Sequence, residues 1–428
     1  MSDLFEDLSY RGIIKNATSE SIKSVLNGKP ITLYCGFDPS SDSLHVGSLL
    51  PLVTLKRFEN AGHNCIAVVG GATGMIGDPS GKSAERNLLT PDVISANLVG
   101  IKSVISKFIN GKVMNNGDWF QNFSYIDFLR DIGKHFTVNI MLTKESVRAR
   151  LEDRDHGISY TEFSYMLLQA YDFYFLNKNH GCEMQIGGSD QWGNITAGCE
   201  LIRRMSANEN PDQINNPPEV HGLTHPLVAK SDGTKFGKSE SGTVWLTPEK
   251  TSPYDFYQFW IRVADSDAIP YLKYFTFLSH SEIDALEQET KLRPESRLAQ
   301  KKLAEEITSM VHGKSELDKV IQTSEALFTG DFSTMSAAQI KSAYAQAPQS
   351  TFSKSSIKSG LPLADVLADT KLCNSKGAAR KDIKGGGIYL NQERVQDPAL
   401  TLSPKDLIED QVLLLRKGKK NFHLVVFE

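Results

Sequence analysis

Apolar residues in the first part of the chain follow the order strand, helix, strand. Residues 31–37 form a short apolar run typical of a buried strand, and apolar residues at helical spacing follow over residues 46–61. Pro51 is tolerated only in the first turn of a helix, so we expect this helix to begin near residues 47–48. Residues 65–70 indicate a second buried strand. A unit of this length predicts two parallel strands with a right-handed crossover, and hence a Rossmann-like sheet.

A second half of the same sheet is predicted further along the chain. Residues 160–176 have the pattern of a helix, and the following Cys182-Glu-Met-Gln-Ile-Gly has that of a strand. Between the two halves lies an insert, at about 118–155, that is rich in aromatic and charged residues. We therefore assign residues 1–225 to a Rossmann-like α/β domain.

Beyond Pro253 the pattern turns helical, and no strand interrupts it. Helices are expected over the following ranges: 254–263, 269–278, 281–289, 293–312 and 317–327. We assign residues 226–329 to a loop followed by an all-helical domain. Residues 330–358, rich in Ser, Ala and Gln, predict a linker, and residues 359–428 predict a small α+β module.

Composition agrees with a soluble protein of two or three domains. The chain has 428 residues, 40% of them hydrophobic and 23% charged, and no apolar run approaches the roughly 18 residues of a membrane span. The N-terminus lacks the pattern of a signal peptide, and the five cysteines form no CxxC pair. We expect a cytoplasmic protein with free thiols and no metal site.

Charge is unevenly distributed along the chain. Residues 351–428 hold 13 Lys/Arg against 9 Asp/Glu, whereas the rest of the chain has a net charge of −8. A basic module on an acidic body favours a nucleic-acid partner, although an excess this small also occurs as ordinary surface scatter.

Two loops have the composition of phosphate sites. Residues 34–48 join a strand to a helix, and a helix N-terminus offers free N–H groups to an anion. His45 could donate to phosphate oxygens, and Gly47 would let a base approach the backbone, although a lone histidine is more often structural. Lys235 and Lys238 lie three apart in a Gly-containing loop and could clamp a triphosphate.

Three further groups of polar residues suit a small polar ligand. Asp78 follows a run with four glycines in residues 70–77 and could pair with an ammonium group. A carboxylate at a strand's end, such as Asp190, often holds a ribose hydroxyl. A polar stripe on a largely apolar helix is costly unless it meets a polar partner. That stripe consists of Tyr165, Gln169 and Asp172.

Together these motifs resemble those of bacterial-type tyrosyl-tRNA synthetases, a class I aminoacyl-tRNA synthetase family, along essentially the whole chain. His45-Val-Gly-Ser is similar to the first signature, usually written HIGH, and Lys235-Phe-Gly-Lys-Ser to the second, usually KMSKS. Ser48 stands where histidine is usual; serine can donate one hydrogen bond but carries no charge. More specific matches are Val69-Gly-Gly-Ala-Thr-Gly, Gln185-Ile-Gly-Gly-Ser-Asp-Gln-Trp-Gly-Asn-Ile and the stripe on the helix. Residues 374–391 resemble a small RNA-binding fold first seen in a ribosomal small-subunit protein.

The resemblance implies a role for each candidate residue. The hydroxyl group of the substrate tyrosine would meet Tyr34 and Asp172. Its amino group would meet Asp78, Tyr165 and Gln169, and its carboxylate would lie near Gln191. The ribose of ATP would meet Cys35, Gly188 and Asp190, and Asp38 would contact the nucleotide or the amino group. The phosphates would be held by His45, Lys235, Lys238 and Ser239, with Gly47 beside the base. Contacts to tRNA are implied for Lys82, Arg86, Arg380, Lys381 and Lys384.

The resemblance implies formation of tyrosyl-adenylate from tyrosine and ATP with Mg²⁺, followed by transfer of tyrosine to tRNA(Tyr). No covalent enzyme intermediate and no general base are implied. Two alternatives stay open: the sister tryptophan enzyme, and an inactive RNA-binding relative that kept the fold. The family also implies a homodimer. The insert contains more apolar aromatic surface than a connector needs, in Trp119, Phe120, Phe123, Tyr125, Phe128, Phe136 and the neighbouring Phe163.

Overall fold

The computed structural model describes residues 3–80, 88–152, 157–233, 236–239, 242–329, 335–344, 347–418 and 421–428. They form two compact units. Unit 1 contains Met1–Thr251 and Phe259–Ile307, and unit 2 contains Ser252–Gln258 and Thr308–Glu428. The segment 226–329, expected as one domain, is therefore divided between the units. Within the described ranges, none of the helices is both long and apolar enough to cross a membrane.

Unit 1 is built on a twisted sheet with the strand order β1-β6-β5-β2-β3-β4. All neighbouring pairs are parallel except β1 with β6, which is antiparallel. The strands are β1 (Asn16–Ala17), β2 (Thr32–Phe37), β3 (Asn64–Val69), β4 (Lys112–Asn115), β5 (Cys182–Gly188) and β6 (His221–His225). The predicted Rossmann-like sheet is confirmed, and β4 and β6 extend it beyond the strands that the sequence indicated.

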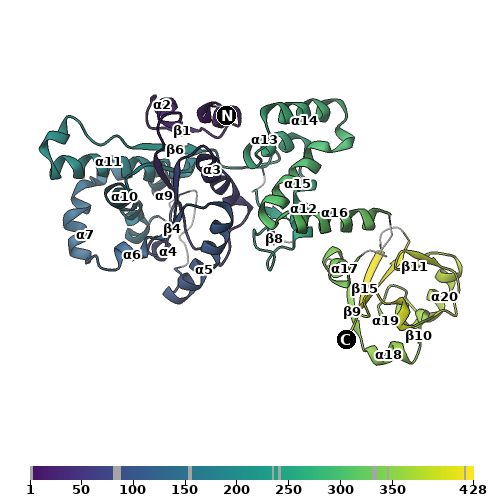
Figure 1. The fold of residues 1–428 in the computed structure, drawn as a ribbon. Coiled ribbons are helices and arrows are strands. Elements are labelled where there is room, and N and C mark those ends of the chain that lie inside the picture. The colour runs from purple at the N-terminus through teal and green to yellow at the C-terminus, as the bar shows by residue number, and fades with distance from the viewer. Residues whose placement is uncertain are drawn as a thin grey trace. The chain divides into compact units, whose positions relative to one another are not determined.

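Helices cover both faces of this sheet. α3 (Leu49–Asn60) and α5 (Pro91–Phe108) lie on one face, and α10 (Tyr160–His180) and α11 (Trp192–Glu209) on the other (Figure 1). α3 begins after a 3₁₀ turn at Val46–Ser48, so Pro51 falls in its first turn as expected. Smaller helices of this unit are α1 (Leu4–Tyr10), α2 (Ile22–Leu26) and α4 (Thr73–Ile76).

The helices after the sheet differ from the predicted ranges at two places. They are α12 (Pro253–Ile261), α13 (Asp265–Phe275), α14 (His280–Leu292), α15 (Leu298–His312) and α16 (Lys314–Thr329). α13 begins four residues earlier than predicted, because Pro270 is accommodated inside the helix. The predicted helix at 293–312 is interrupted at Arg297, whose φ of 50° ends a short 3₁₀ turn before α15 begins.

The insert forms α6 (Gly117–Phe120), α7 (Tyr125–Asp131), α8 (Val138–Leu142) and α9 (Glu145–Glu152). Most of its aromatic residues pack inward, contrary to the expectation of a large aromatic surface. The ring of Trp119 stacks on Phe175 of α10 at 4.6 Å, and Phe120, Phe123 and Phe128 pack around Tyr171 of the same helix. These contacts join the core behind the sheet. Tyr125 is exposed, as expected. The other exposed apolar side chains of the described part of the insert are Ile126, Val138, Ile140, Leu142 and Leu151, and Tyr160 at the start of α10 is exposed as well.

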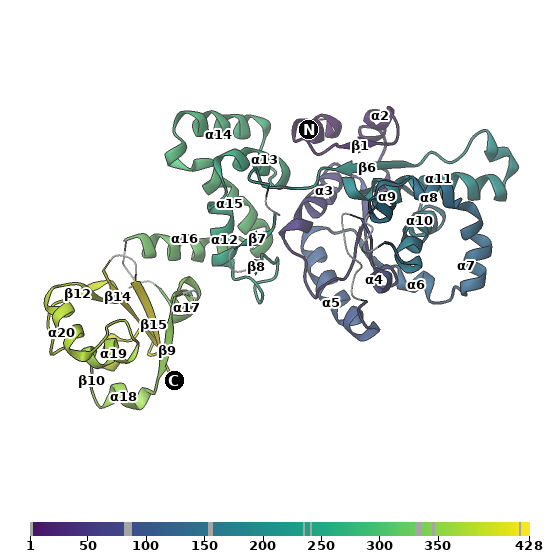
Figure 2. The same cartoon turned by 180° about the vertical axis from the view of Figure 1, so that it is seen from behind.

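Unit 2 contains a sheet with the order β12-β11-β14-β15-β9. Its strands are β9 (Gln349–Phe352), β11 (Ile388–Leu390), β12 (Glu393–Val395), β14 (Val412–Lys417) and β15 (Asn421–Phe427), and its helices include α17 (Ala337–Ala343), α18 (Lys354–Lys358), α19 (Leu363–Asp369) and α20 (Lys376–Lys384) (Figure 2). Residues 349–358, expected in a linker, instead form β9 and α18. β9 pairs with β15 in parallel, so the module begins before residue 359.

Candidate active site at the carboxyl ends of the strands

The predicted site residues of unit 1 gather at one edge of the sheet. β2, β3, β4 and β5 are parallel neighbours, so their carboxyl ends and the loops that follow meet there. The buried face of α10 adds the predicted polar stripe to the same edge.

Tyr34 and Asp172 form the deepest part of the site. The side chain of Tyr34 on β2 is 1% exposed, and no described group hydrogen-bonds to its hydroxyl. Burial raises the pKa of Tyr34 well above its usual value, and the nearby charge of Asp172 raises it further. Because an unpaired buried hydroxyl is costly, this arrangement suits a ligand that brings its own hydrogen-bonding group.

Asp172 is held by two donors that the sequence analysis did not identify as site residues. Its Oδ1 accepts from Trp119 Nε1 at 2.9 Å, and its Oδ2 accepts from Asn116 Nδ2 at 3.1 Å. Burial raises the pKa of Asp172 to about 7, although both hydrogen bonds oppose the rise. Asn116 follows β4, the strand that was not predicted, so its place at this edge was not visible in the sequence.

A hydrogen-bonded network connects this carboxylate to the loop after β2. Asn116 Nδ2 also donates to Thr73 Oγ1 at 3.0 Å, and Thr73 Oγ1 donates to Asp38 Oδ1 at 2.8 Å. The other oxygen of Asp38 accepts from the Tyr165 hydroxyl at 2.9 Å. Gly70 borders this network, and a Cβ there would collide with the Asp38 carboxylate. The Asp38–Tyr165 pair therefore unites two predicted site residues from distant segments.

A second network surrounds Asp78. Its Oδ2 accepts from Gln191 Nε2 at 2.6 Å, and its Oδ1 accepts from the Ser80 amide at 2.9 Å. Asn194 Nδ2 donates to Gln169 Oε1 at 2.9 Å and to Gln191 Oε1 at 3.3 Å. The predicted residues Asp78, Gln169 and Gln191 therefore meet, and Asn194 joins them from the first turn of α11.

The first signature loop is held by backbone pairing to residues after the lysine loop. The Val46 amide donates to the Val244 carbonyl at 3.0 Å, and the Leu246 amide donates to the Leu44 carbonyl at 2.9 Å. His45 Nδ1 accepts from the Gly47 amide at 2.9 Å, which fixes the orientation of the ring. A Cβ on Gly47 would lie 2.5 Å from the His45 ring, so only glycine fits this turn.

The lysine loop comprises residues 229–239, of which 229–233 and 236–239 are described. Phe236 is buried, and its ring stacks on that of Phe275 at 5.7 Å. The backbone of Lys238 and Ser239 forms β7, which pairs with β8 (Gly242–Thr243). Three predicted contact residues lie outside the described ranges, namely Lys82, Arg86 and Lys235.

The residues predicted at the ribose lie at the ends of β2 and β5. Cys35 is buried next to Tyr34 on β2, and burial raises the pKa of its thiol to about 12. Burial also raises the pKa of Asp190, and the charge of Asp78 adds to the rise. A Cβ on Gly188 would lie 2.5 Å from Asp190 Oδ1, so glycine admits this carboxylate beside the strand. Across the described ranges, no group of three or more His, Cys, Asp and Glu side chains is arranged to hold a metal ion.

The predicted RNA-contacting residues of unit 2 share one helix. Arg380, Lys381 and Lys384 are exposed on α20, whereas Ala379 and Ile383 of the same helix are buried in the core of the unit. The helix therefore presents a basic outer surface, which is the arrangement that phosphate contacts require.

Comparisons with known proteins agree with this geometry. The profile described as "tRNA synthetases class I (W and Y)" matches residues 26–329, and the "Tyrosine--tRNA ligase SYY-like C-terminal domain" matches residues 339–425. Tyrosine--tRNA ligase 1 of Bacillus subtilis is 51% identical, with all of both chains covered, and the Bacillus caldotenax tyrosine--tRNA ligase is 49% identical over 99% of both. A C-terminally truncated mitochondrial tyrosyl-tRNA synthetase from Aspergillus nidulans has a TM-score of 0.68 at 32% identity, covering 76% of this chain and 94% of its own.

The chain therefore belongs to the class I tRNA synthetases of the tryptophan and tyrosine group. Its identity of about half to full-length relatives places it among the tyrosine--tRNA ligases of that group, so it is an aminoacyl-tRNA synthetase. Neither the tryptophan enzyme nor an inactive relative is favoured by these matches.

Proposed function

We propose that the site activates L-tyrosine with Mg·ATP and that the tyrosyl group is then transferred to the 3′ end of tRNA(Tyr). The observation that carries the substrate assignment is the buried Tyr34 hydroxyl, which has no described hydrogen-bond partner, beside the buried carboxylate of Asp172. A phenol hydroxyl would donate to Asp172 and accept from Tyr34. An indole offers a single donor and no acceptor, so it would leave Tyr34 unpaired.

The same pair would exclude phenylalanine. Without the phenol, both buried polar groups would lose their partner on binding, and this discrimination is one for which tyrosyl-tRNA synthetases are the standard example. The ammonium group of tyrosine is assigned to Asp78, Tyr165 and Gln169, and its carboxylate to the vicinity of Gln191. Support comes from the hydrogen bond between Asp78 and Gln191, which gathers these groups at one place.

The nucleotide is assigned to the loops around the same edge. Cys35, Gly188 and Asp190 would meet the ribose, Asp38 would meet the nucleotide or the ammonium group, and Gly47 would lie beside the base. His45, Lys235, Lys238 and Ser239 would hold the phosphates. The hydrogen bond from the Gly47 amide to His45 Nδ1 supports this assignment, since it orients the imidazole ring in the turn that leads into α3. Mg²⁺ would enter with ATP as part of the substrate.

The chemistry requires no group on the enzyme to form or break a bond. The tyrosine carboxylate, already ionised at neutral pH, attacks the α-phosphorus as the bond to diphosphate breaks, and Mg·diphosphate leaves. A ribose hydroxyl at the tRNA terminus then attacks the tyrosyl carbonyl, and AMP leaves with the electron pair of the broken acyl–oxygen bond, while the hydroxyl proton passes to a phosphate oxygen of the departing AMP or to water. The protein contributes alignment of the reactants and stabilisation of the charge that develops on the phosphates.

Exchange of labelled diphosphate into ATP tests the proposal without tRNA. The reaction should depend on tyrosine, whereas tryptophan and phenylalanine should each support exchange at no more than a small fraction of that rate. Tyr34→Phe should weaken tyrosine binding. A matched control is Tyr389→Phe, since Tyr389 lies in β11 of unit 2. Exchange that depends equally on tryptophan, or no exchange at all, would contradict the assignment.

The basic surface of α20 is assigned to the tRNA backbone. Arg380, Lys381 and Lys384 would contact phosphates, and Lys82 and Arg86 would meet the acceptor end. The exposure of the three α20 side chains supports the first part. Replacing all three by Ala should weaken tRNA binding and flatten its salt dependence while tyrosine-dependent exchange is unchanged. We also propose that the enzyme acts in the cytoplasm.

We assign the exposed apolar side chains of the insert to a homodimer interface. Ile126, Val138 and Ile140 are 68%, 56% and 50% exposed on α7 and α8, and several large exposed apolar side chains in one segment of the chain favour an interaction surface. Sedimentation at micromolar concentration should give twice the mass of the chain. Ile126→Asp should shift that mass toward the monomer, because a charge buried in a symmetric contact is repeated on both sides.

A further inference from the structure

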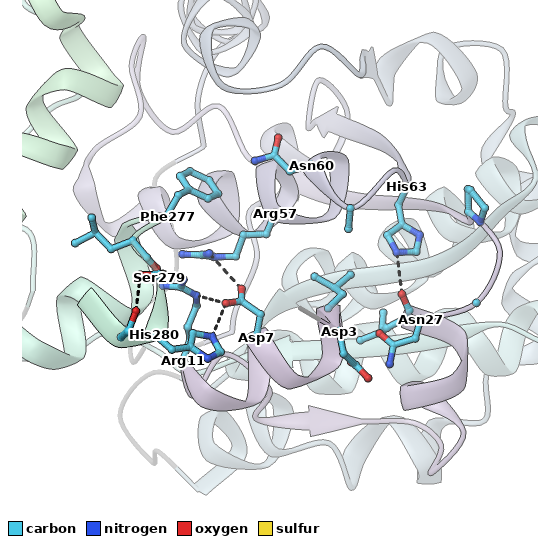
Figure 3. A pocket seen from close by; sticks show the side chains of 17 residues that line it. Asp3, Asp7, Arg11, Asn27, Arg57, Asn60, His63, Phe277, Ser279 and His280 are labelled. Atoms are coloured by element: carbon cyan, nitrogen blue, oxygen red, sulfur yellow. Dashed lines mark hydrogen bonds and ion pairs between the residues drawn. The ribbon is translucent and has the colours of Figure 1, made fainter. Parts of the chain in front are cut away.

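Arg11, the residue that follows α1, caps the end of α13. Arg11 Nη1 donates to the carbonyls of Lys273 at 3.2 Å and Thr276 at 3.1 Å, and its Nη2 donates to the Leu278 carbonyl at 2.6 Å. Its Nε donates to Asp7 Oδ1 at 2.7 Å, which fixes the guanidinium plane. The carbonyls at a helix end have no partner inside the helix, so Arg11 satisfies groups that are otherwise open. The cluster lines a pocket (Figure 3).

A second arginine brings α3 into the same cluster. Arg57, in the last turn of α3, donates through Nη2 to the same Thr276 carbonyl, and its Nη1 lies 3.4 Å from Asp7 Oδ2. Asp7 also accepts from His280 Nε2 at 2.9 Å. Both arginine side chains are less than 5% exposed, so their contacts are shielded from water and difficult to replace. Asp7, Arg11 and Arg57 are called the arginine cluster below.

One face of α13 also holds the lysine loop, through Asp267, Tyr271 and Phe275. Asp267 Oδ1 accepts from the Ser231 amide at 3.0 Å, and the Tyr271 hydroxyl donates to the Ala229 carbonyl at 3.0 Å. The ring of Phe275 stacks on Phe236 with an interplanar angle of 11°. The three side chains lie four residues apart and so share a face of the helix. The position of α13 therefore sets the position of the loop.

α3 carries the other signature. The turn at Val46–Ser48 runs directly into α3, and Arg57 lies nine residues further along, or about 13 Å along the helix axis. The N-terminal end of α3 therefore follows directly after His45. Its C-terminal end is hydrogen-bonded, through Arg57, to the Thr276 carbonyl at the end of α13. We infer that the arginine cluster positions the lysine loop against His45 for adenylate formation, by holding the end of α13 to the end of α3.

This inference rests on the proposed function, since it assigns the phosphates to His45 and the lysines. A displacement on the order of 1 Å in the alignment of reacting groups is enough to lower the rate about 100-fold. Loss of the distant arginine cluster can therefore slow the reaction at the phosphates. Tyrosine binding should be affected far less, because its proposed pocket is built from β2, α10 and the loops after β3, β4 and β5, and none of its residues belongs to the arginine cluster. Disrupting the arginine cluster should therefore lower the rate of adenylate formation without a matching loss of tyrosine affinity.

The test compares Arg57→Met with a matched control. Methionine keeps the apolar stem but removes every hydrogen bond of the guanidinium group. The control is Arg293→Met, because Arg293 is 63% exposed and pairs with Glu289 on the surface of α14. The measurement is the pre-steady-state rate of tyrosyl-adenylate formation per active site, with active sites counted by bound adenylate. We expect Arg57→Met to lose tenfold or more in this rate, with the tyrosine Kd changed less than twofold, and Arg293→Met to match the unmodified enzyme.

A double-variant cycle separates positioning from simple stabilisation. Phe236→Leu weakens the stack on Phe275 without touching the cluster. If the cluster acts on the loop through α13, both substitutions disturb the same connection. The loss of rate in the double variant Arg57→Met/Phe236→Leu should then be much smaller than the product of the losses in the two single variants. Losses that multiply would show that Arg57 acts independently of the loop, and would overturn the inference.

Two further outcomes are decisive. An unchanged rate per active site in Arg57→Met, with only a lower Tm, would show that the cluster merely stabilises the fold. If Arg57→Met fails to fold, Asp7→Asn decides in its place, since it keeps the shape of the side chain and should lose about threefold in rate with the same unchanged tyrosine Kd. Failure of the proposed function itself would appear first, as an absence of tyrosine-dependent exchange in the unmodified enzyme.

Discussion

The affinity for tyrosine should depend on pH through Asp172. Its carboxylate is buried in the pocket, where burial raises its pKa to about 7. The phenol of tyrosine is proposed to donate to the ionised form of this carboxylate. The amino and carboxyl groups of free tyrosine do not titrate between pH 6 and pH 8, and the pKa values of Tyr34 and Tyr165 lie far above this range because both residues are buried. Binding of tyrosine without ATP therefore reports on the carboxylates of the site, and comparison with Asp172→Asn separates the part that belongs to Asp172.

The magnitude follows from the titration of one group. With a pKa of about 7, the carboxylate is about nine-tenths ionised at pH 8 and about one-tenth ionised at pH 6. The charged carboxylate accepts from the phenol more strongly than the protonated acid does, so binding is favoured above pH 7 and weakens as the pH falls. The tyrosine Kd should therefore be larger at pH 6 than at pH 8, by up to about tenfold, which corresponds to at most about 1.4 kcal/mol.

Equilibrium dialysis with labelled tyrosine at pH 6, 7 and 8 is the direct assay. Asp172→Asn is the matched variant, since it keeps the shape of the side chain and cannot titrate. Its affinity should be weaker than that of the unmodified enzyme at pH 8 and constant across the range. A Kd that stays constant in the unmodified enzyme would refute the reasoning, as would an equal pH dependence in Asp172→Asn.

Three other outcomes are expected. Trp119→Phe removes a donor to the Asp172 carboxylate, a hydrogen bond worth about 1.5–3 kcal/mol, so the midpoint of the tyrosine affinity profile should rise by about one to two pH units; an unchanged midpoint would show that this donor does not tune Asp172. Lys238→Ala should slow adenylate formation at least tenfold while the tyrosine Kd changes less than twofold, and an unchanged pre-steady-state rate would remove Lys238 from the phosphate site. A chain that ends at Thr329 should keep tyrosine-dependent exchange within about twofold yet lose most tRNA charging; a parallel loss of both reactions would indicate a structural role for the C-terminal module.

The part of the fold that carries the site could be predicted because its central strands are largely buried. β2 and β3 are mainly apolar, β5 alternates apolar and polar residues, and α3 shows helical periodicity up to Asn60, so the crossover and the edge that binds ligands followed from the sequence. β4 could not be predicted, since Lys112–Asn115 is only partly buried and its residues are mixed. The donor Asn116 was missed for the same reason.

Two other differences arise from contacts that a local pattern does not contain. Gln349–Phe352 has the polar composition of a linker, and only its pairing with β15 makes it a strand. The aromatic residues of the insert were expected to be surface, but Trp119 and Phe120 pack against α10, which is some fifty residues further along the chain. The periodicity of apolar residues in a sequence indicates which positions are apolar. It does not indicate which other segment of the chain packs against them.

The amide of Asn116 has consequences for changing the amino acid that this site accepts. Its two hydrogens are both committed, one to Asp172 and one to Thr73, which in turn holds Asp38. Replacing Asp172 by an apolar residue, to admit a tyrosine analogue without the hydroxyl, would leave one amide hydrogen and the Trp119 indole without an acceptor, at a cost of about 1–3 kcal/mol for each. Asn116 would keep its bonds to the Ala72 amide and to Thr73 but lose one of its three partners, which loosens the network that leads through Thr73 to Asp38. A redesigned pocket must therefore provide a new acceptor near residue 172, or the altered selectivity will come with poorer alignment of ATP.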